Sequence, residues 1–148
     1  MSSKFLSTSD INLWYGASYL DINGSTLTIA LPPMSPSAIN ANFKTAPDYN
    51  GNVELKLNWI YVDGQNTELY LKTNVTVIDS SGNSYVAAEE VMISTFNLIG
   101  NDLRSTTIIE LQDIGPDTLI DIILMRNYQG SSDPLTETVG VVGIELVM

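Results

Sequence analysis

Two apolar runs in the last third of the chain constrain its fold more than any other feature. The first covers residues 119–126, the second covers residues 139–147, and aliphatic side chains dominate both. Each run has the length of one strand, and a polar loop that contains Asp133-Pro134 separates them. Paired runs of this kind predict neighbouring strands that close a β-sandwich. Because the second run ends one residue before Met148, we expect a structural strand there rather than a tail.

The middle of the chain shows the clearest strand pattern. Apolar and polar residues alternate strictly over residues 53–59, and this period places every second side chain on one face of a strand. Trp59 ends the apolar face and is expected in the core. Two dipeptides favour tight hairpin turns, Asn23-Gly24 and Asp63-Gly64, and each is followed by a run of strand-favouring residues.

Other segments are less regular. After Pro32-Pro33, residues 34–52 predict a long irregular crossing loop with at most one helical turn. Residues 79–83 predict a turn, and residues 85–91 mix helix-favouring with strand-favouring side chains. With about eight strands, no amphipathic helix and no internal repeat, the sequence predicts an all-β fold, an antiparallel β-sandwich of jelly-roll type.

Length and N-terminal composition divide the chain into an arm and a body. A chain of 148 residues suits one domain with one hydrophobic core. Residues 1–12 are polar apart from Phe5, Leu6 and Ile11, which suits an arm that docks on a neighbour or a frayed end. We therefore expect an N-terminal arm over residues 1–12, mobile in isolation, and a single sandwich domain over residues 13–148.

The charge of the chain excludes several classes of partner. The formal net charge is -11, from 17 acidic and 6 basic residues, and the basic residues are scattered along the sequence. Such a chain repels phosphate backbones and anionic membranes, so neither nucleic acid nor a membrane is expected as a partner. The acidity serves solubility or, alternatively, a specific cationic partner.

Cysteine and targeting segments are missing from the sequence. Without cysteine the chain has no disulfide and no thiolate ligand. The N-terminal residues lack the apolar run of a secretory signal, and no stretch approaches the ~18 apolar residues of a membrane span. We therefore expect synthesis in a cytoplasm, with stability supplied by packing or assembly.

Catalysis is difficult to build from these residues. Histidine and cysteine, the commonest general base and the strongest nucleophile at neutral pH, are both missing. Glu89 and Glu90 would point to opposite faces of a strand, whereas a glycosidase needs two carboxylates that converge on one bond. Residues 79–83 suit a turn better than a metal site. The sequence predicts no enzyme, no catalytic residue, no metal site and no cofactor.

Aromatic side chains are the remaining candidates for recognition, because sugar-binding sandwiches stack sugar rings on exposed tryptophan or tyrosine. Trp14 and Tyr61, like Trp59, are expected to pack in the core or at an interface. Tyr128 lies next to a polar loop and is the best candidate for an exposed ring that contacts a glycan or a partner.

Several short motifs follow one another in a recognisable order. Ala46-Pro47-Asp48-Tyr49 precedes Leu55-Lys56-Leu57-Asn58-Trp59, the run 119–126 ends in arginine, and residues 139–146 form a glycine-containing last strand. This order over residues 40–148 resembles the small jelly-roll domains of tailed-phage virions, in which a P-x-D-Y loop leads into a strand with tryptophan. The chain departs from that pattern in Gly140-Val141-Val142-Gly143, which is one step tighter, and in a longer, more acidic middle.

The resemblance implies a non-enzymatic structural protein of the virion, a capsid decoration (cement) or fibre protein that is commonly a homotrimer. In this hypothesis Phe5, Leu6 and Ile11 of the arm dock on the major capsid protein or another virion protein. The protein would be made in the cytoplasm of a bacterial host and would reside in the virion. The alternative is a carbohydrate-binding module or receptor-binding tip that contacts a host glycan, favoured by the surplus of tyrosine at strand ends and in loops.

Overall fold

Most residues that the structure describes lie in strands. The computed structural model describes residues 3–22, 26–33, 35–61, 68–94, 102–127 and 138–148. Among them one short 3₁₀ turn, η1 (Thr8–Asp10), is the helical part. The strands are β1 (Ser3–Ser7), β2 (Asn12–Leu13), β3 (Ser18–Ile22), β4 (Thr26–Leu31), β5 (Ser37–Lys44), β6 (Gly51–Tyr61), β7 (Glu68–Ile78), β8 (Ser84–Ser94), β9 (Arg104–Ile114), β10 (Leu119–Arg126) and β11 (Val139–Val147).

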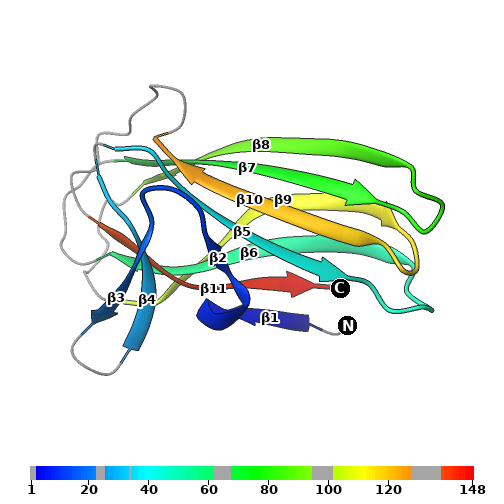
Figure 1. Cartoon of the computed structure of the whole chain (residues 1–148), viewed down its shortest axis with the longest axis horizontal. Coiled ribbons are helices and arrows are strands. Elements are labelled where there is room, and N and C mark those ends of the chain that lie inside the picture. Colours follow the sequence, from blue (N-terminus) through cyan, green and yellow to red (C-terminus); the bar gives the residue numbers. More distant parts are fainter. Residues whose placement is uncertain (1–2, 23–25, 34, 62–67, 95–101, 128–137) are drawn as a thin grey trace.

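The strands form two antiparallel sheets that make a sandwich (Figure 1). Sheet A has the order β3-β4-β11-β6-β9, and β1 also pairs with β11. Sheet B has the order β2-β5-β10-β7-β8. Every described pairing between strands is antiparallel. The predicted antiparallel β-sandwich is therefore confirmed, with eleven described strands in place of the expected number of about eight.

One hydrophobic core lies between the sheets. The alternation in β6 buries Val53, Leu55, Leu57 and Trp59 completely, and β7 and β10 alternate in the same way. The indole N–H of Trp59 donates to Oγ1 of Thr106 at 3.0 Å, so the polar atom of this buried ring is satisfied. The predicted core position of Trp59 is therefore confirmed.

The N-terminal segment belongs to the sandwich, which corrects the prediction of a separate arm over residues 1–12. β1 pairs with β11 from Ser3 opposite Val147 to Ser7 opposite Gly143. Leu6 and Ile11 are 4% and 3% exposed and are members of the core cluster. The isolated apolar residues of this segment are inward-facing positions, because burying them removes more apolar surface from water than leaving them on a mobile arm.

A strand replaces much of the predicted crossing loop. Residues 37–44 form β5 between β2 and β10, so an irregular loop with at most one helical turn is wrong for this part of residues 34–52. Ile39 and Ala41 face the core, whereas Asn40 lies on the outer side of the sheet. Asparagine and alanine are poor strand formers, and the sheet on both sides of β5 overrides that local preference.

The two predicted hairpins have different outcomes. β3 and β4 pair directly on either side of Asn23-Gly24, with Ile22 opposite Thr26. In contrast, β6 and β7 lie in different sheets, so no hairpin joins them at Asp63-Gly64 and that prediction is wrong. β6 pairs with β11 and β9, and β7 pairs with β10 and β8, so the local turn signal does not determine the partners of either strand.

The hairpin between β7 and β8 is built around one aspartate. Oδ1 of Asp79 accepts hydrogen bonds from the backbone N–H groups of Ser81 and Asn83, each at 2.9 Å. This is the local side-chain bonding that makes aspartate a turn former, and it confirms the predicted turn over residues 79–83. The ambiguous residues 85–91 lie in β8, paired with β7 along its whole length.

A buried arginine joins the two sheets. Arg126 ends β10 in sheet B and is fully buried, and its Nη1 donates to the backbone C=O of Leu31 in sheet A at 2.8 Å. A buried cation is tolerated when hydrogen bonds satisfy its donors. Arg126 therefore fixes the distance between β10 and β4.

Candidate functional site

Three aromatic side chains are exposed in the segment that passes from β2 in sheet B to β3 in sheet A. Trp14 is 51% exposed, and Tyr15 and Tyr19 are exposed to a similar degree. The N–H of Trp14 donates to the C=O of Ala38 at 3.1 Å, and the C=O of Tyr15 accepts from the N–H of Ala38 at 2.9 Å. These bonds hold the backbone of Trp14 and Tyr15 along β5, whereas Tyr19 lies in β3 and pairs with β4 in sheet A.

Trp14 lies outside the core, so the predicted core position is wrong and the predicted alternative, an interface, stays a prediction. Leu13 packs against the core and Asn12 is exposed, so alternation along the strand places Trp14 on the outer face of sheet B beside Asn12. The physical reason is the position of β2, a strand of two residues at the edge of its sheet. No other described strand flanks β2 beyond that edge to cover the ring.

Gly16 fixes the direction in which the chain leaves Trp14 and Tyr15. Its φ is +70°, a left-handed conformation, and a Cβ at this position would lie 2.1 Å from the carbonyl oxygen of Pro36. Only glycine accepts both the backbone angle and the close approach. Ala38 therefore holds the backbone at Trp14 and Tyr15, and the close approach at position 16 to Pro36 requires a glycine.

Polar side chains continue from Trp14 across the outer face of sheet B. Asn12 lies opposite Asn40, Asn40 opposite Ile123, and Ile123 opposite Asn74. Neighbouring strands lie about 4.8 Å apart, so this row crosses four strands with an amide on three of them. Asn12 and Asn74 can present both a donor and an acceptor to a ligand, whereas Asn40 is buried within the row.

A carboxylate on the same face is held in a fixed orientation. Nδ2 of Asn40, which is buried, donates to Oδ1 of Asp121 and to the C=O of Ile122, each at 3.0 Å. Asp121 is half-buried and lies opposite the exposed Asn42. We call this surface the Trp14 face, and its members are Asn12, Trp14, Asn42, Asn74 and Asp121.

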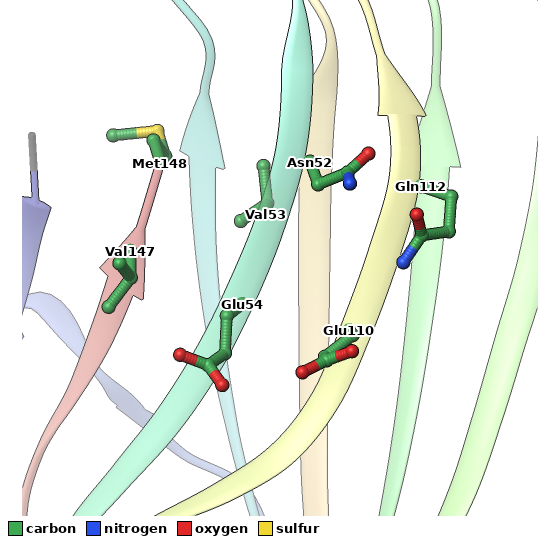
Figure 2. A pocket seen from close by; sticks show the side chains of 7 residues that line it. All are labelled: Asn52, Val53, Glu54, Glu110, Gln112, Val147 and Met148. Atoms are coloured by element: carbon green, nitrogen blue, oxygen red, sulfur yellow. The ribbon is translucent and has the colours of Figure 1, made fainter. Parts of the chain in front are cut away.

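A hollow of about 360 Å³ forms a second candidate site, on sheet A (Figure 2). It lies where β6 and β9 run side by side next to the end of β11. Its polar lining consists of Asn52, Glu54, Glu110 and Gln112, and its apolar lining consists of Val53, Val147 and Met148. None of these lining residues is aromatic, which separates the hollow from the Trp14 face.

The polar groups of the hollow are held by their neighbours. Oε2 of Glu54 accepts from the hydroxyl of Thr107 at 2.9 Å, and Oε1 lies 3.7 Å from Nζ of Lys56. Glu54 and Glu110 are directly opposed on neighbouring strands, an arrangement of like charges that destabilises a sheet. Lys56 offsets part of this repulsion, although a partly exposed ion pair contributes little.

Tyr49 lies beside this hollow and supports its rim. Its hydroxyl donates to the backbone C=O of Asn52, whose side-chain Oδ1 in turn accepts from the N–H of Asp113 at 3.0 Å. Burial raises the pKa of the Tyr49 phenol above its ordinary value of 10.0. The phenol therefore stays protonated, and the bond to Asn52 persists, throughout the neutral range.

The three residues predicted to dock on a partner differ in their exposure. Phe5 is 47% exposed, whereas Leu6 and Ile11 lie in the core and cannot present a docking surface in this fold. Tyr128 and the side chain of Tyr61 lie outside the described residues. For Trp14 the sequence predicts the core or an interface, and the signal that favours a position outside the core is the glycine two residues further on, which indicates a turn.

Two classes of site receive no support from the described residues. Within the described ranges, no three acidic, histidine or cysteine side chains are grouped so that they could hold a metal ion. Glu89 and Glu90 lie opposite Thr73 and Lys72 in the register with β7, on opposite faces of sheet B as predicted. Among the described residues, no helix is long and apolar enough to cross a membrane.

Solved structures of other β-sandwich domains are similar to this fold. A family 35 carbohydrate binding module from Clostridium thermocellum matches with a TM-score of 0.59 at 13% identity, over 99% of this chain and 98% of that chain. The mosquito-larvicidal Cry4Aa toxin from Bacillus thuringiensis matches with a TM-score of 0.65 at 14% identity, over 98% of this chain and 23% of the toxin chain.

An isomalto-dextranase from Arthrobacter globiformis T6, solved with panose, matches with a TM-score of 0.62 at 10% identity, over 99% of this chain and 23% of that chain. No protein-family model and no curated protein sequence matches this chain. At these identities the likenesses establish the β-sandwich fold alone, because one fold carries many functions.

Proposed function

We propose that this protein is a non-catalytic carbohydrate-binding domain and that the Trp14 face binds the glycan. The observation that carries the proposal is a tryptophan, 51% exposed, whose backbone is bonded to the edge of sheet B, on the same outer face as Asn12, Asn74 and the oriented carboxylate of Asp121. A sugar ring has an apolar face and a rim of hydroxyl groups. An exposed indole matches the first, and planar polar side chains match the second.

The geometry of the Trp14 face supports binding at low entropic cost. Trp14 is fixed through its backbone by Ala38, and Asp121 is fixed by Asn40. Binding groups that are already in place lose little conformational freedom when the ligand arrives. Asn42 is exposed beside Asp121, so an amide and a carboxylate can engage neighbouring hydroxyl groups of one sugar.

The comparisons support the same proposal at the level of the fold. The module from Clostridium thermocellum, which spans nearly the same length as this chain, is named for carbohydrate binding. A role without catalysis is supported by the composition, which contains no histidine and no cysteine. Glu89 and Glu90, the adjacent carboxylates, diverge rather than converge.

Intrinsic fluorescence tests the proposal at the site itself. The chain contains two tryptophans, of which Trp14 is exposed and Trp59 is fully buried. Glycans that are retained in a screen of immobilised neutral and acidic polysaccharides are titrated into the protein while its emission is recorded. We expect a spectral change with a saturable ligand dependence, because a sugar that stacks on Trp14 alters its exposure to water.

Two variants separate this site from general binding. Trp14→Ala should weaken glycan affinity at least tenfold, about 1.4 kcal/mol. Tyr85→Ala serves as the matched control, because Tyr85 is an equally exposed aromatic residue on β8 and should leave affinity unchanged. Retention of every glycan by the Trp14→Ala variant would reject the Trp14 face, and no retention of any glycan by the wild-type protein would reject the function.

The virion role stays a prediction, together with the homotrimer, the capsid partner and the bacterial host cytoplasm. A receptor-binding tip on a virion would itself bind a host glycan, so the two hypotheses overlap at the Trp14 face. Solution mass measured by light scattering separates them, since a trimer that is independent of concentration favours the virion assembly.

A further inference from the structure

β8 forms a long and regular open edge of the sandwich. It pairs with β7 at every residue from Ser84 to Ser94 without a register shift, and on its other side it pairs with no described strand. In Figure 1 it runs along the upper border of the molecule. The other sheet edges differ, because β2 and β3 are short and β9 has two register shifts against β6.

The outer side of this edge is mainly apolar, and Glu90, the one carboxylate on it, lies opposite Lys72 of β7. Val86 is 65% exposed and Met92 is 70% exposed, the two highest values among the large hydrophobic residues of the described chain. Both lie on the same face of β8, as does the exposed Ala88 between them. Natural proteins usually protect a sheet edge by keeping the edge strand short, by adding a bulge or by giving it a polar surface. A long and regular edge with a mainly apolar face therefore indicates that something covers it.

The inner side of the same edge is acidic. A groove of about 370 Å³ lies between β8 and β9, and Glu89 and Val91 of β8 line it together with Ile108 and Glu110 of β9. Glu89 is exposed, and its strand position is opposite the buried Thr73. A strand added beside β8 would place alternate side chains in this groove and next to Val86 and Met92.

We propose that β8 accepts an extended segment of a partner protein, one that alternates lysine or arginine with apolar residues. Backbone hydrogen bonds to the open edge would supply affinity, and the two faces would supply specificity, as in other cases of strand addition. Basic residues fit the groove with Glu89 and Glu110, and apolar residues fit the side with Val86 and Met92.

Charge argues against a second copy of this chain as the occupant. Two β8 strands paired antiparallel over their full length would place Glu89 of one copy directly opposite Glu89 of the other, with each Glu90 opposite Ala88 beside that pair. Like charges directly opposite one another destabilise a sheet, and each copy carries a formal net charge of -11. Glu89, which opposes self-pairing, attracts a basic strand from its place in the groove.

The test uses a fluorescein-labelled peptide of about ten residues, the length of a long strand, in which lysine alternates with valine and threonine. Fluorescence anisotropy with the full chain measures its affinity, and a peptide with glutamate in place of lysine should not bind. Glu89→Gln should weaken binding about fivefold, the upper range for an exposed ion pair. Glu90→Gln is the matched control, because it removes the same charge one residue away on the opposite face.

Hydrogen exchange identifies the mode of binding. Only alternate N–H groups of an edge strand bond to its neighbour, so the added peptide should slow the exchange of the remaining amides of β8. Three results would overturn the proposal. These are equal loss of affinity in Glu89→Gln and Glu90→Gln, protection that appears outside β8, and a free protein that already dimerises with protected β8 amides.

Discussion

The N-terminal strand should contribute several kcal/mol to stability, and Leu6→Ala measures that contribution. Leu6 is 4% exposed, and β1 is bonded to β11 from Ser3 to Ser7. The substitution removes about three buried aliphatic carbons, which corresponds to about 2.4 kcal/mol at about 0.8 kcal/mol each. The cavity that remains raises the loss to about 3 kcal/mol. In a domain of this size that loss lowers Tm by about 10 °C.

Urea unfolding followed by far-UV circular dichroism gives the free energy of unfolding, with Lys4→Ala as the control. Lys4 lies in the same strand but is exposed, so its replacement should change the free energy by less than about 0.5 kcal/mol. A Leu6→Ala protein with the unfolding midpoint of the wild type would refute the reasoning. That result would mean that residues 3–11 do not pack against the sandwich in solution and form a free arm instead.

Three further predictions concern single contacts. Gly143→Ala would place a methyl group 2.7 Å from the carbonyl oxygen of Leu6 and should lower stability by about 1–3 kcal/mol in thermal unfolding. Gly115→Ala is the control and should leave stability unchanged, because no atom lies within 4 Å of the added methyl group. Because burial raises the pKa of Tyr49 above 10.0, the folded protein keeps this proton after the unfolded chain loses it. The resulting stabilisation is complete below about pH 10 and is lost as pH rises through the folded pKa. Between about pH 9 and 11 the free energy of unfolding should therefore fall less in Tyr49→Phe than in the wild type. Asp79→Ala removes the acceptor of two turn bonds and should lower stability by about 1 kcal/mol, while Asp79→Asn, which keeps an acceptor oxygen, should lose less on the same thermal assay.

The strands that could be predicted are those whose residues alternate or run apolar without interruption. β6, β10 and β11 are strands of this kind, and their core positions follow from the pleat of a strand. Pairing is different, because β6 bonds to β11 and β9 rather than to its neighbour in sequence. Local turn chemistry at Asp63-Gly64 carries no information about such distant partners.

The residues that could not be predicted depend on tertiary contacts. The outer face of β5 holds Asn40, whose amide is satisfied by Asp121, a residue of β10 far along the chain. Leu6 and Ile11 look isolated in the sequence because their neighbours in the core come from other strands. Trp14 is a large ring that sequence patterns assign to the core or to an interface, and only the edge position of β2 shows that nothing among the described strands covers it.

The last strand of the described chain also sets the order in which the protein can fold. β11 is bonded to β6 on one side and to both β4 and β1 on the other, so sheet A has no continuous path of backbone bonds without it. A ribosome makes β11 after every other described strand, and the strand must then find partners that reach back to Ser3. Pairings at such long separation in sequence slow folding. A chain truncated before Val139 should therefore remain an incomplete sandwich. A synthetic peptide of residues 138–148, added to that chain, should bind and complete sheet A.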